Sequence, residues 1–131
     1  LYVSILDDSI ISANILQKYS KKSLNKVFFI TIETALGKVV AAADEDFLYM
    51  VSFEDSKNIE KYIQTISRQL SCTFVEDKNK LLTAFELELS DYLEGKLKKF
   101  SIPVKMFGSD FQKLVFLSNK INLRKKQQNY P

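Results

Sequence analysis

Cys72 is the only thiol in this sequence and its only candidate nucleophile. A cysteine attacks as the thiolate, so it needs a neighbouring group that takes its proton or lowers its pKa. The sequence contains no histidine that could do so. Because Cys72 also lies between a predicted helix and a short predicted strand, we interpret it as a small apolar residue beside the core. We name no catalytic residue.

The acidic residues do not predict a metal site. Asp44, Glu45 and Asp46 are consecutive, so their carboxylates point in different directions, as they do in a solvated turn. One cysteine and no histidine cannot supply the usual four ligands of zinc. We therefore expect no metal and no cofactor. A second acidic group falls on the outer side of a predicted helix and consists of Glu86, Glu88, Asp91 and Glu94.

Length and composition favour one folded domain. The chain has 131 residues, of which 46% are hydrophobic and 12% aromatic, with 3 glycines and 2 prolines. This length supports one core of ordinary size, and the composition argues against a disordered or fibrous chain. There is no apolar run of transmembrane length and no secretory signal pattern. We expect a cytoplasmic protein without membrane contact, and the single cysteine agrees with a reducing compartment.

Positive charge is concentrated at the C-terminal end. Residues 113–131 carry five basic side chains and no acid, whereas the rest of the chain has 14 basic and 16 acidic residues. Attraction to nucleic acid would therefore come from this end, and the alternative is a solvated tail. The candidate nucleic-acid contacts are Lys120, Arg124, Lys125 and Lys126.

The pattern of strands and helices predicts a mixed α/β fold. Residues 27–34, 38–43 and 47–53 read as three strands with short connections, which favours an antiparallel meander. A helix capped by Asp55 or Ser56 and a short strand at residues 73–75 follow. Residues 1–25 are the least legible part and predict a short helix.

The stretch from residue 85 to residue 112, with the helix that leads into it, carries the clearest local signals. A helix with one apolar side is expected to start at Asp77 or Asn79 and to stop at Gly95, which can adopt the left-handed conformation. Pro103 keeps the next segment extended. Ser109 and Gln112 then form a capping box for a last helix.

Several short motifs occur here in a characteristic order. They are Thr34-x-Leu36-Gly37-Lys38, Tyr92-Leu93-x-Gly95-Lys96, Phe100-x-x-Pro103 and Gly108-Ser109-x-Phe111-Gln112. In this order the chain resembles the methylated-DNA-protein-cysteine methyltransferases, the DNA-repair alkyltransferases. The resemblance implies an N-terminal extension at residues 1–25, a ribonuclease-H-like domain at 26–107, and a truncated start of the DNA-binding domain with a basic tail at 108–131.

The family's chemistry is not visible in the sequence. The resemblance implies an acceptor cysteine in a Pro-Cys-His-Arg motif, and this motif is absent. We expect the N-terminal portion of an enzyme that removes alkyl groups from guanine in double-stranded DNA, inactive by itself and with weak or no DNA binding. The alternative is a non-catalytic interaction or DNA-binding module with the same fold. Exposed apolar residues of the last helix, Phe111, Leu114 and Val115, predict self-association.

Overall fold

The fold is mixed α/β, as the sequence predicts. The computed structural model describes residues 8–105 and residue 107, and for residues 8–13 it describes the backbone. The elements in chain order are α1 (Asp8–Tyr19), β1 (Lys26–Thr34), β2 (Gly37–Ala43), β3 (Leu48–Phe53), α2 (Ile59–Leu70), β4 (Thr73–Glu76) and α3 (Lys80–Leu93).

Within the described residues, four strands form one sheet in the order β3-β2-β1-β4. The first three strands make an antiparallel meander, which confirms the predicted pairing. Strand β4 lies on the other side of β1 and runs parallel to it, with Lys26 opposite Thr73 and Phe29 opposite Glu76. Strand β1 is therefore an interior strand, as its two apolar sets of side chains indicate.

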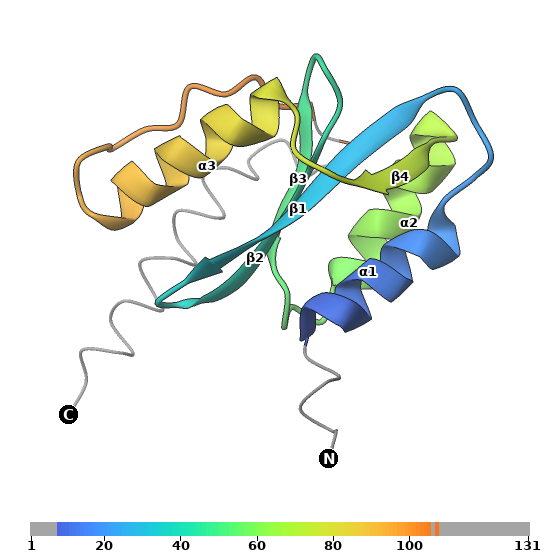
Figure 1. Cartoon of the computed structure of the whole chain (residues 1–131), viewed down its shortest axis with the longest axis horizontal. Helices are drawn as coiled ribbons and strands as arrows, with labels where there is room; N and C mark the ends of the chain where they lie inside the picture. The colour runs from blue at the N-terminus through green and yellow to red at the C-terminus, as the bar shows by residue number, and fades with distance from the viewer. Residues whose placement is uncertain (1–7, 106, 108–131) are drawn as a thin grey trace.

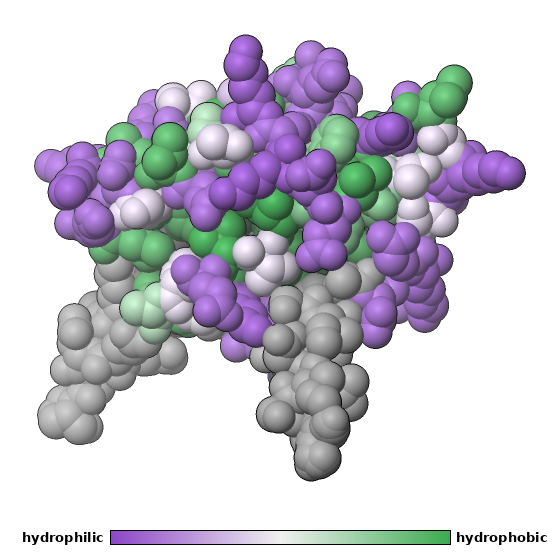
Figure 2. Space-filling view, viewed as in Figure 1, coloured by the Kyte–Doolittle hydropathy of each residue, from purple (hydrophilic) through white to green (hydrophobic). Residues whose placement is uncertain are grey.

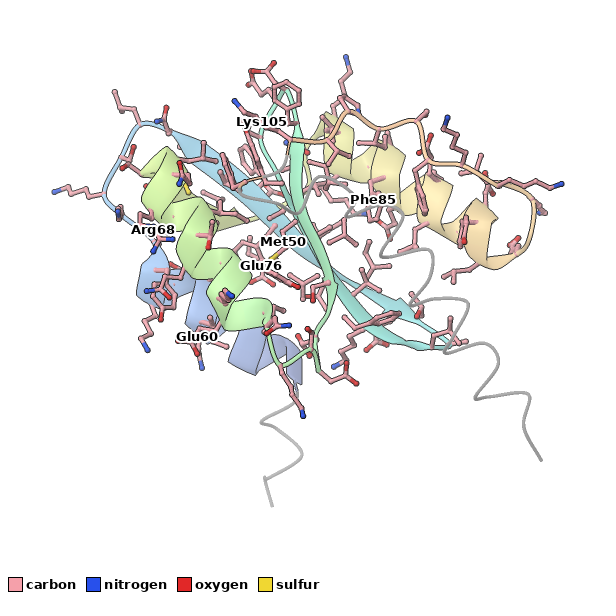
Figure 3. All side chains as sticks on the ribbon, turned by 180° about the vertical axis from the view of Figure 1, so that it is seen from behind. Met50, Glu60, Arg68, Glu76, Phe85 and Lys105 are labelled. Atoms are coloured by element: carbon pink, nitrogen blue, oxygen red, sulfur yellow. The ribbon has the colours of Figure 1, made fainter. Side chains whose placement is uncertain are left out.

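Helices cover both faces of this sheet (Figure 1). Helices α1 and α2 lie on one face and α3 lies on the other. Figure 3 shows the two sides through labelled residues: Phe85 lies between α3 and the sheet, and Met50 lies on the α2 side. Side chains of β1 alternate between the two clusters, with Phe29 under α2 and Ile30 under α3. No helix among the described residues is long and apolar enough to cross a bilayer.

Helix α1 is fixed to the core by Leu16 and by hydrogen bonds near its end. Leu16 is completely buried in the cluster under α2. The hydroxyl of Ser67 on α2 donates to the carbonyl of Tyr19 at 2.5 Å, and the hydroxyl of Ser20 accepts from the amide of Phe74 at 2.8 Å. The end of α1 and Ser20 therefore pack against α2 and β4 and belong to the same folded domain.

The two ends of α3 are closed as the local sequence predicts. Asn79 accepts a hydrogen bond from the amide of Leu82 at 2.8 Å and is the N-cap. At the other end Gly95 is left-handed (φ 80°), and its amide donates to the carbonyl of Tyr92. The amide of Lys96 donates to the carbonyl of Asp91 at 2.8 Å. These two bonds are those of a Schellman motif.

The start of α2 differs from the prediction. Its N-cap is Asn58, which makes no capping hydrogen bond through its side chain, whereas the sequence favoured Asp55 or Ser56. Ser56 instead organises a turn ahead of the helix: its carbonyl accepts from the amide of Ile59, and its hydroxyl accepts from the amide of Asn58, both at 3.3 Å. A good capping residue was therefore used for a turn that comes before the helix.

After α3 the chain returns along the edge of the sheet in an extended conformation. Phe100 packs between Phe85 and Tyr92, with ring centroids 5.7 and 5.0 Å away. Leu48 at the start of β3 donates to the carbonyl of Pro103 and accepts from the amide of Lys105. The extended segment around Pro103 is thus confirmed, and it is joined to β3 by a short parallel bridge.

Candidate functional site

Cys72 lies directly after α2, where the chain turns from the helix into β4. Ser71 closes the helix in a left-handed conformation (φ 46°), and the amide of Lys21 donates to the carbonyl of Cys72 at 2.8 Å. The Cys72 side chain is 0% exposed and belongs to the cluster under α1 and α2. Cys72 and Leu70 also line a cleft of about 570 Å³ that is bordered by residues 24–28 and 44–46. Because the Cys72 side chain is 0% exposed, it forms part of the floor of this cleft without open surface.

Burial makes this thiol a poor nucleophile. It raises the pKa of Cys72 to about 11, although the positive charge of Lys21 acts in the opposite sense. At pH 7 roughly one thiol in ten thousand is then ionised. The position and the raised pKa agree with the interpretation of Cys72 as a residue of the core.

The acidic turn after β2 is a fixed corner of the fold. The carboxylate of Asp44 accepts hydrogen bonds from the amides of Asp46 and Phe47 at 2.8 and 2.9 Å, and from the hydroxyl of Tyr49 at 2.5 Å. Glu45 and Asp46 are exposed, as expected for a solvated turn, but Asp44 is bonded inward. Within the described part of the chain, no group of three or more His, Cys, Asp or Glu residues could hold a metal ion.

The hydroxyl of Tyr49 donates a hydrogen bond to the Asp44 carboxylate and so stabilises this turn. Burial raises the pKa of its phenol, and the hydrogen bond to Asp44 raises it further. The phenol therefore stays protonated and donates to the carboxylate at any ordinary pH. The side-chain amide of Asn79 adds a bond to the Asp44 carbonyl at 3.0 Å, so the same corner touches the N-cap of α3. No motif in the sequence indicated this arrangement, because its members come from separate elements.

The acidic residues on the outer side of α3 make local contacts. Glu86 pairs with Lys78 at 2.7 Å, and Glu94 pairs with Lys96 at 3.1 Å. Glu88 accepts hydrogen bonds from the amide of Ser101, at 2.9 Å, and from its hydroxyl. These carboxylates hold neighbouring turns in place, and each has a local partner.

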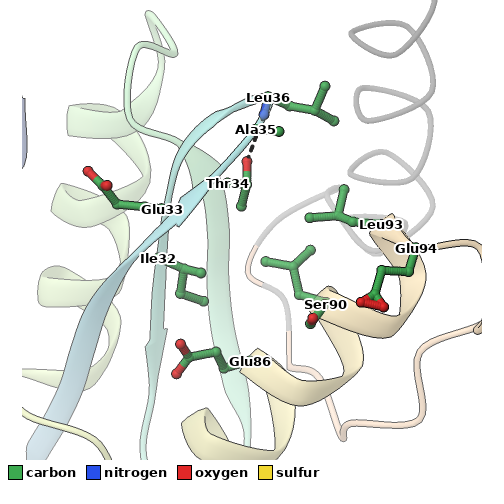
Figure 4. A pocket seen from close by; sticks show the side chains of 10 residues that line it. Ile32, Glu33, Thr34, Ala35, Leu36, Glu86, Ser90, Leu93 and Glu94 are labelled. Atoms are coloured by element: carbon green, nitrogen blue, oxygen red, sulfur yellow. Dashed lines mark hydrogen bonds between the residues drawn. The ribbon is translucent and has the colours of Figure 1, made fainter.

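A groove of about 490 Å³ lies between the C-terminal half of α3 and the hairpin that joins β1 to β2 (Figure 4). Ile32 and Leu36 border it from the hairpin, and Leu89 and Leu93 border it from the helix. Figure 2 shows hydrophobic side chains at the surface between the end of α3 and the hairpin. The carboxylates among its lining residues are Glu33, Glu86 and Glu94, and no basic residue lines it. The groove joins segments more than fifty residues apart, and the sequence analysis missed it.

The other predicted site residues lie outside the described residues. This holds for the candidate nucleic-acid contacts Lys120, Arg124, Lys125 and Lys126, for the Ser109 and Gln112 capping box, and for Phe111, Leu114 and Val115.

Comparison with known proteins identifies the family. Residues 27–106 match the family model of the 6-O-methylguanine DNA methyltransferase ribonuclease-like domain. The chain belongs to this family. The match covers the sheet, α2, α3 and the extended segment of this ribonuclease-like domain.

One curated protein and two solved structures are similar to part of this chain. The constitutive methylated-DNA-protein-cysteine methyltransferase of Bacillus subtilis (strain 168) is 28% identical over 91 residues, which are 68% of this chain and 50% of that protein. The crystal structure of Mycobacterium tuberculosis O6-methylguanine methyltransferase has a TM-score of 0.46 and 19% identity, over 70% of this chain and 49% of that one. A variant of that protein has a TM-score of 0.45 and 22% identity, with the same coverage. The chain therefore spans about half the length of these relatives.

Proposed function

We propose that this chain acts as the supporting ribonuclease-like domain of a DNA-repair alkyltransferase and does not itself accept alkyl groups. Membership of the family supports the repair context. The observation that carries the proposal is the state of Cys72, which is completely buried and holds its proton up to a pH of about 11.

Alkyl transfer requires an accessible thiolate, so the burial and protonation of Cys72 bear directly on whether it can accept an alkyl group. The alkyl carbon leaves the guanine oxygen as a bond to sulfur forms, so the sulfur must be a thiolate within reach of the base. The Cys72 side chain has no exposed surface beneath α1 and α2, so a base would not touch its sulfur in the folded chain, and the sequence holds no histidine that could take the proton. The role that remains for this domain is structural support of a separate acceptor.

Intact-mass measurement tests this proposal directly. The chain is incubated with a duplex oligonucleotide that contains O6-methylguanine, and the B. subtilis relative is treated in parallel as a positive control. We expect a mass increase of one methyl group for the relative and none for this chain. A methyl group on Cys72, absent in the Cys72→Ala variant, would overturn the proposal.

A second function, binding of duplex DNA as an interaction module, is favoured by one observation in the sequence. Residues 113–131 carry five basic side chains without a single acid. Such a stretch binds phosphates in a salt-sensitive way. A fluorescence-anisotropy titration at two salt concentrations tests it: binding that weakens with salt and disappears when residues 119–131 are removed supports the module. Equal anisotropy with and without those residues would reject it.

A further inference from the structure

The outer edge of β4 is closed by residues 17–21, the end of α1 and the turn after it, which we call the edge cover. Among the described residues β4 has β1 on one side and no strand on the other (Figure 1). The amide of Thr73 donates to the carbonyl of Asn25, so the backbone groups of Thr73 face β1. Alternate residues of a strand direct these groups to opposite sides, and the N–H and C=O of Phe74 therefore point away from β1.

Three outward backbone groups of this edge are bonded to the edge cover. The amide of Phe74 donates to the hydroxyl of Ser20 at 2.8 Å, and its carbonyl accepts from the side-chain amide of Gln17 at 3.4 Å. The carbonyl of Cys72 accepts from the amide of Lys21 at 2.8 Å. The edge cover therefore occupies the positions at which a further strand would bond to β4.

Contacts to the core and to α2 hold the edge cover in place. Leu16, the residue before it, is completely buried under α2. The carbonyl of Tyr19 accepts from the hydroxyl of Ser67 at 2.5 Å, and the hydroxyl of Tyr19 donates to Glu60 at 2.6 Å. Because the edge cover is the end of a helix, it presents no row of strand backbone groups, and the sheet stops there.

We propose that the edge cover is an autoinhibitory contact, which keeps β4 from pairing with β4 of a second copy of this chain. When the edge cover is displaced, the N–H and C=O of Phe74 become free together. In an antiparallel pair with Phe74 on the two-fold axis, the two copies exchange both of these bonds. This register also places Thr73 opposite Val75, and β-branched and aromatic side chains favour a strand. The contact works in the same way whether or not the chain takes part in DNA repair.

Sedimentation equilibrium of full-length variants measures the effect of the edge cover on association. Gln17→Ala/Ser20→Ala removes both side chains that bond Phe74, and its association constant should be at least about ten times that of the unchanged chain. Ser20→Thr keeps a hydroxyl acceptor, and Asn14→Ala/Lys22→Ala changes two exposed residues that flank the edge cover. Both controls should associate like the unchanged chain. An unaltered association constant in the double variant would overturn the proposal.

Hydrogen exchange shows whether the association uses β4. In the double variant, the amide of Phe74 should exchange more slowly as the protein concentration rises, because a second copy then accepts its hydrogen bond. Association through another surface would leave this exchange rate independent of concentration and would overturn the proposal. Ser20→Ala alone, which keeps the bond from Gln17, should show a smaller change in the same direction, and it serves as the test variant if the double variant unfolds.

A proline at the edge of β4 provides the reverse test. In the proposed register the amide of Glu76 bonds to the carbonyl of Cys72 in the second copy. Glu76→Pro removes this N–H on the outer side of an edge strand, where proline is tolerated, and Glu76 is exposed. Added to the double variant, Glu76→Pro should return the association constant to that of the unchanged chain. Undiminished association in this triple variant would overturn the proposal.

Discussion

The two faces of the sheet differ in how completely their apolar side chains are buried among the described residues. The face under α1 and α2 is closed: Leu16, Ile63 and Cys72 are completely buried there. The face under α3 has an equally dry centre around Phe85 but ends in a groove at the hairpin. The comparison teaches that, among the described residues, the first face is fully buried, whereas the second face is buried at its centre and bordered by an apolar groove at its hairpin end.

The sharpest test of this comparison is a pair of alanine substitutions. Ile63→Ala removes a completely buried side chain from the closed face and should lower the free energy of unfolding by about 2–5 kcal/mol. Leu93→Ala at the half-buried rim of the groove should cost about 1 kcal/mol, because less surface leaves contact. Urea unfolding followed by circular dichroism measures both. Equal losses at the two sites would break the comparison.

Reactivity of Cys72 reports how tightly the closed face is sealed. Because its pKa is raised from 9.0 to about 11, the thiolate fraction below pH 9 should be roughly a hundred times smaller in the folded chain than in the unfolded one. Iodoacetamide labelling in buffer and in urea measures the ratio. Equal labelling rates in the two solvents would show that the face opens.

The same raised pKa gives stability a pH dependence with a definite sign. The folded thiol keeps its proton above pH 9, where the unfolded thiol has lost it. Its contribution is therefore complete below pH 9 and is lost as the pH rises toward 11. Cys72→Ala should show a smaller fall in the free energy of unfolding over this range, and parallel curves for the two proteins would contradict the assignment.

The Asp44 corner links the two faces, since it bonds Tyr49 in the cluster under α2 and touches the N-cap of α3. Asp44→Ala leaves two amides and a phenol without their acceptor and should cost about 2 kcal/mol. Asp46→Ala, at an exposed position of the same turn, is the matched control and should change stability by less than about 0.5 kcal/mol. Thermal unfolding of the two variants compares them. If both behave alike, the corner is a solvated turn after all.

The smallest effect is expected at the end of α3. Gly95 has φ 80°, and a Cβ added there would meet nothing within 4 Å. Gly95→Ala should therefore cost about 1 kcal/mol through backbone strain alone. Gly95→Asn should cost less, because asparagine tolerates the left-handed region. A loss beyond about 2 kcal/mol for alanine, measured by urea unfolding, would point to a contact that the folded chain does not show.

Local signals predicted this fold well, and contacts between distant segments did not follow from them. Asn79 and Gly95 were recognised because capping depends on a few neighbouring residues. The strand at residues 73–75 was predicted, but its parallel pairing with β1 depends on a contact 47 residues apart that has no local signature. The cap at Asp55 or Ser56 was wrong because the same residue types also form turns.

The candidate site shows the same division. The single thiol and the missing histidine led to the prediction that Cys72 is a residue of the core, and the structure buries it there; that it accepts no alkyl group stays a prediction. The Asp44 corner and the groove escaped prediction, since each combines side chains from elements that meet through the tertiary fold. The placement of residues 108–131 stays a prediction.

The parallel pairing of β4 with β1 has a consequence for synthesis on the ribosome. The meander of β1, β2 and β3 is complete once residue 53 has emerged, but β4 and α2 follow later in the chain. Until then one edge of β1, with its run of Phe28, Phe29 and Ile30, has unpaired backbone groups. An open apolar edge is a template for aggregation. Slow elongation between residues 53 and 76 should therefore increase the demand for chaperones more than a pause anywhere after β4.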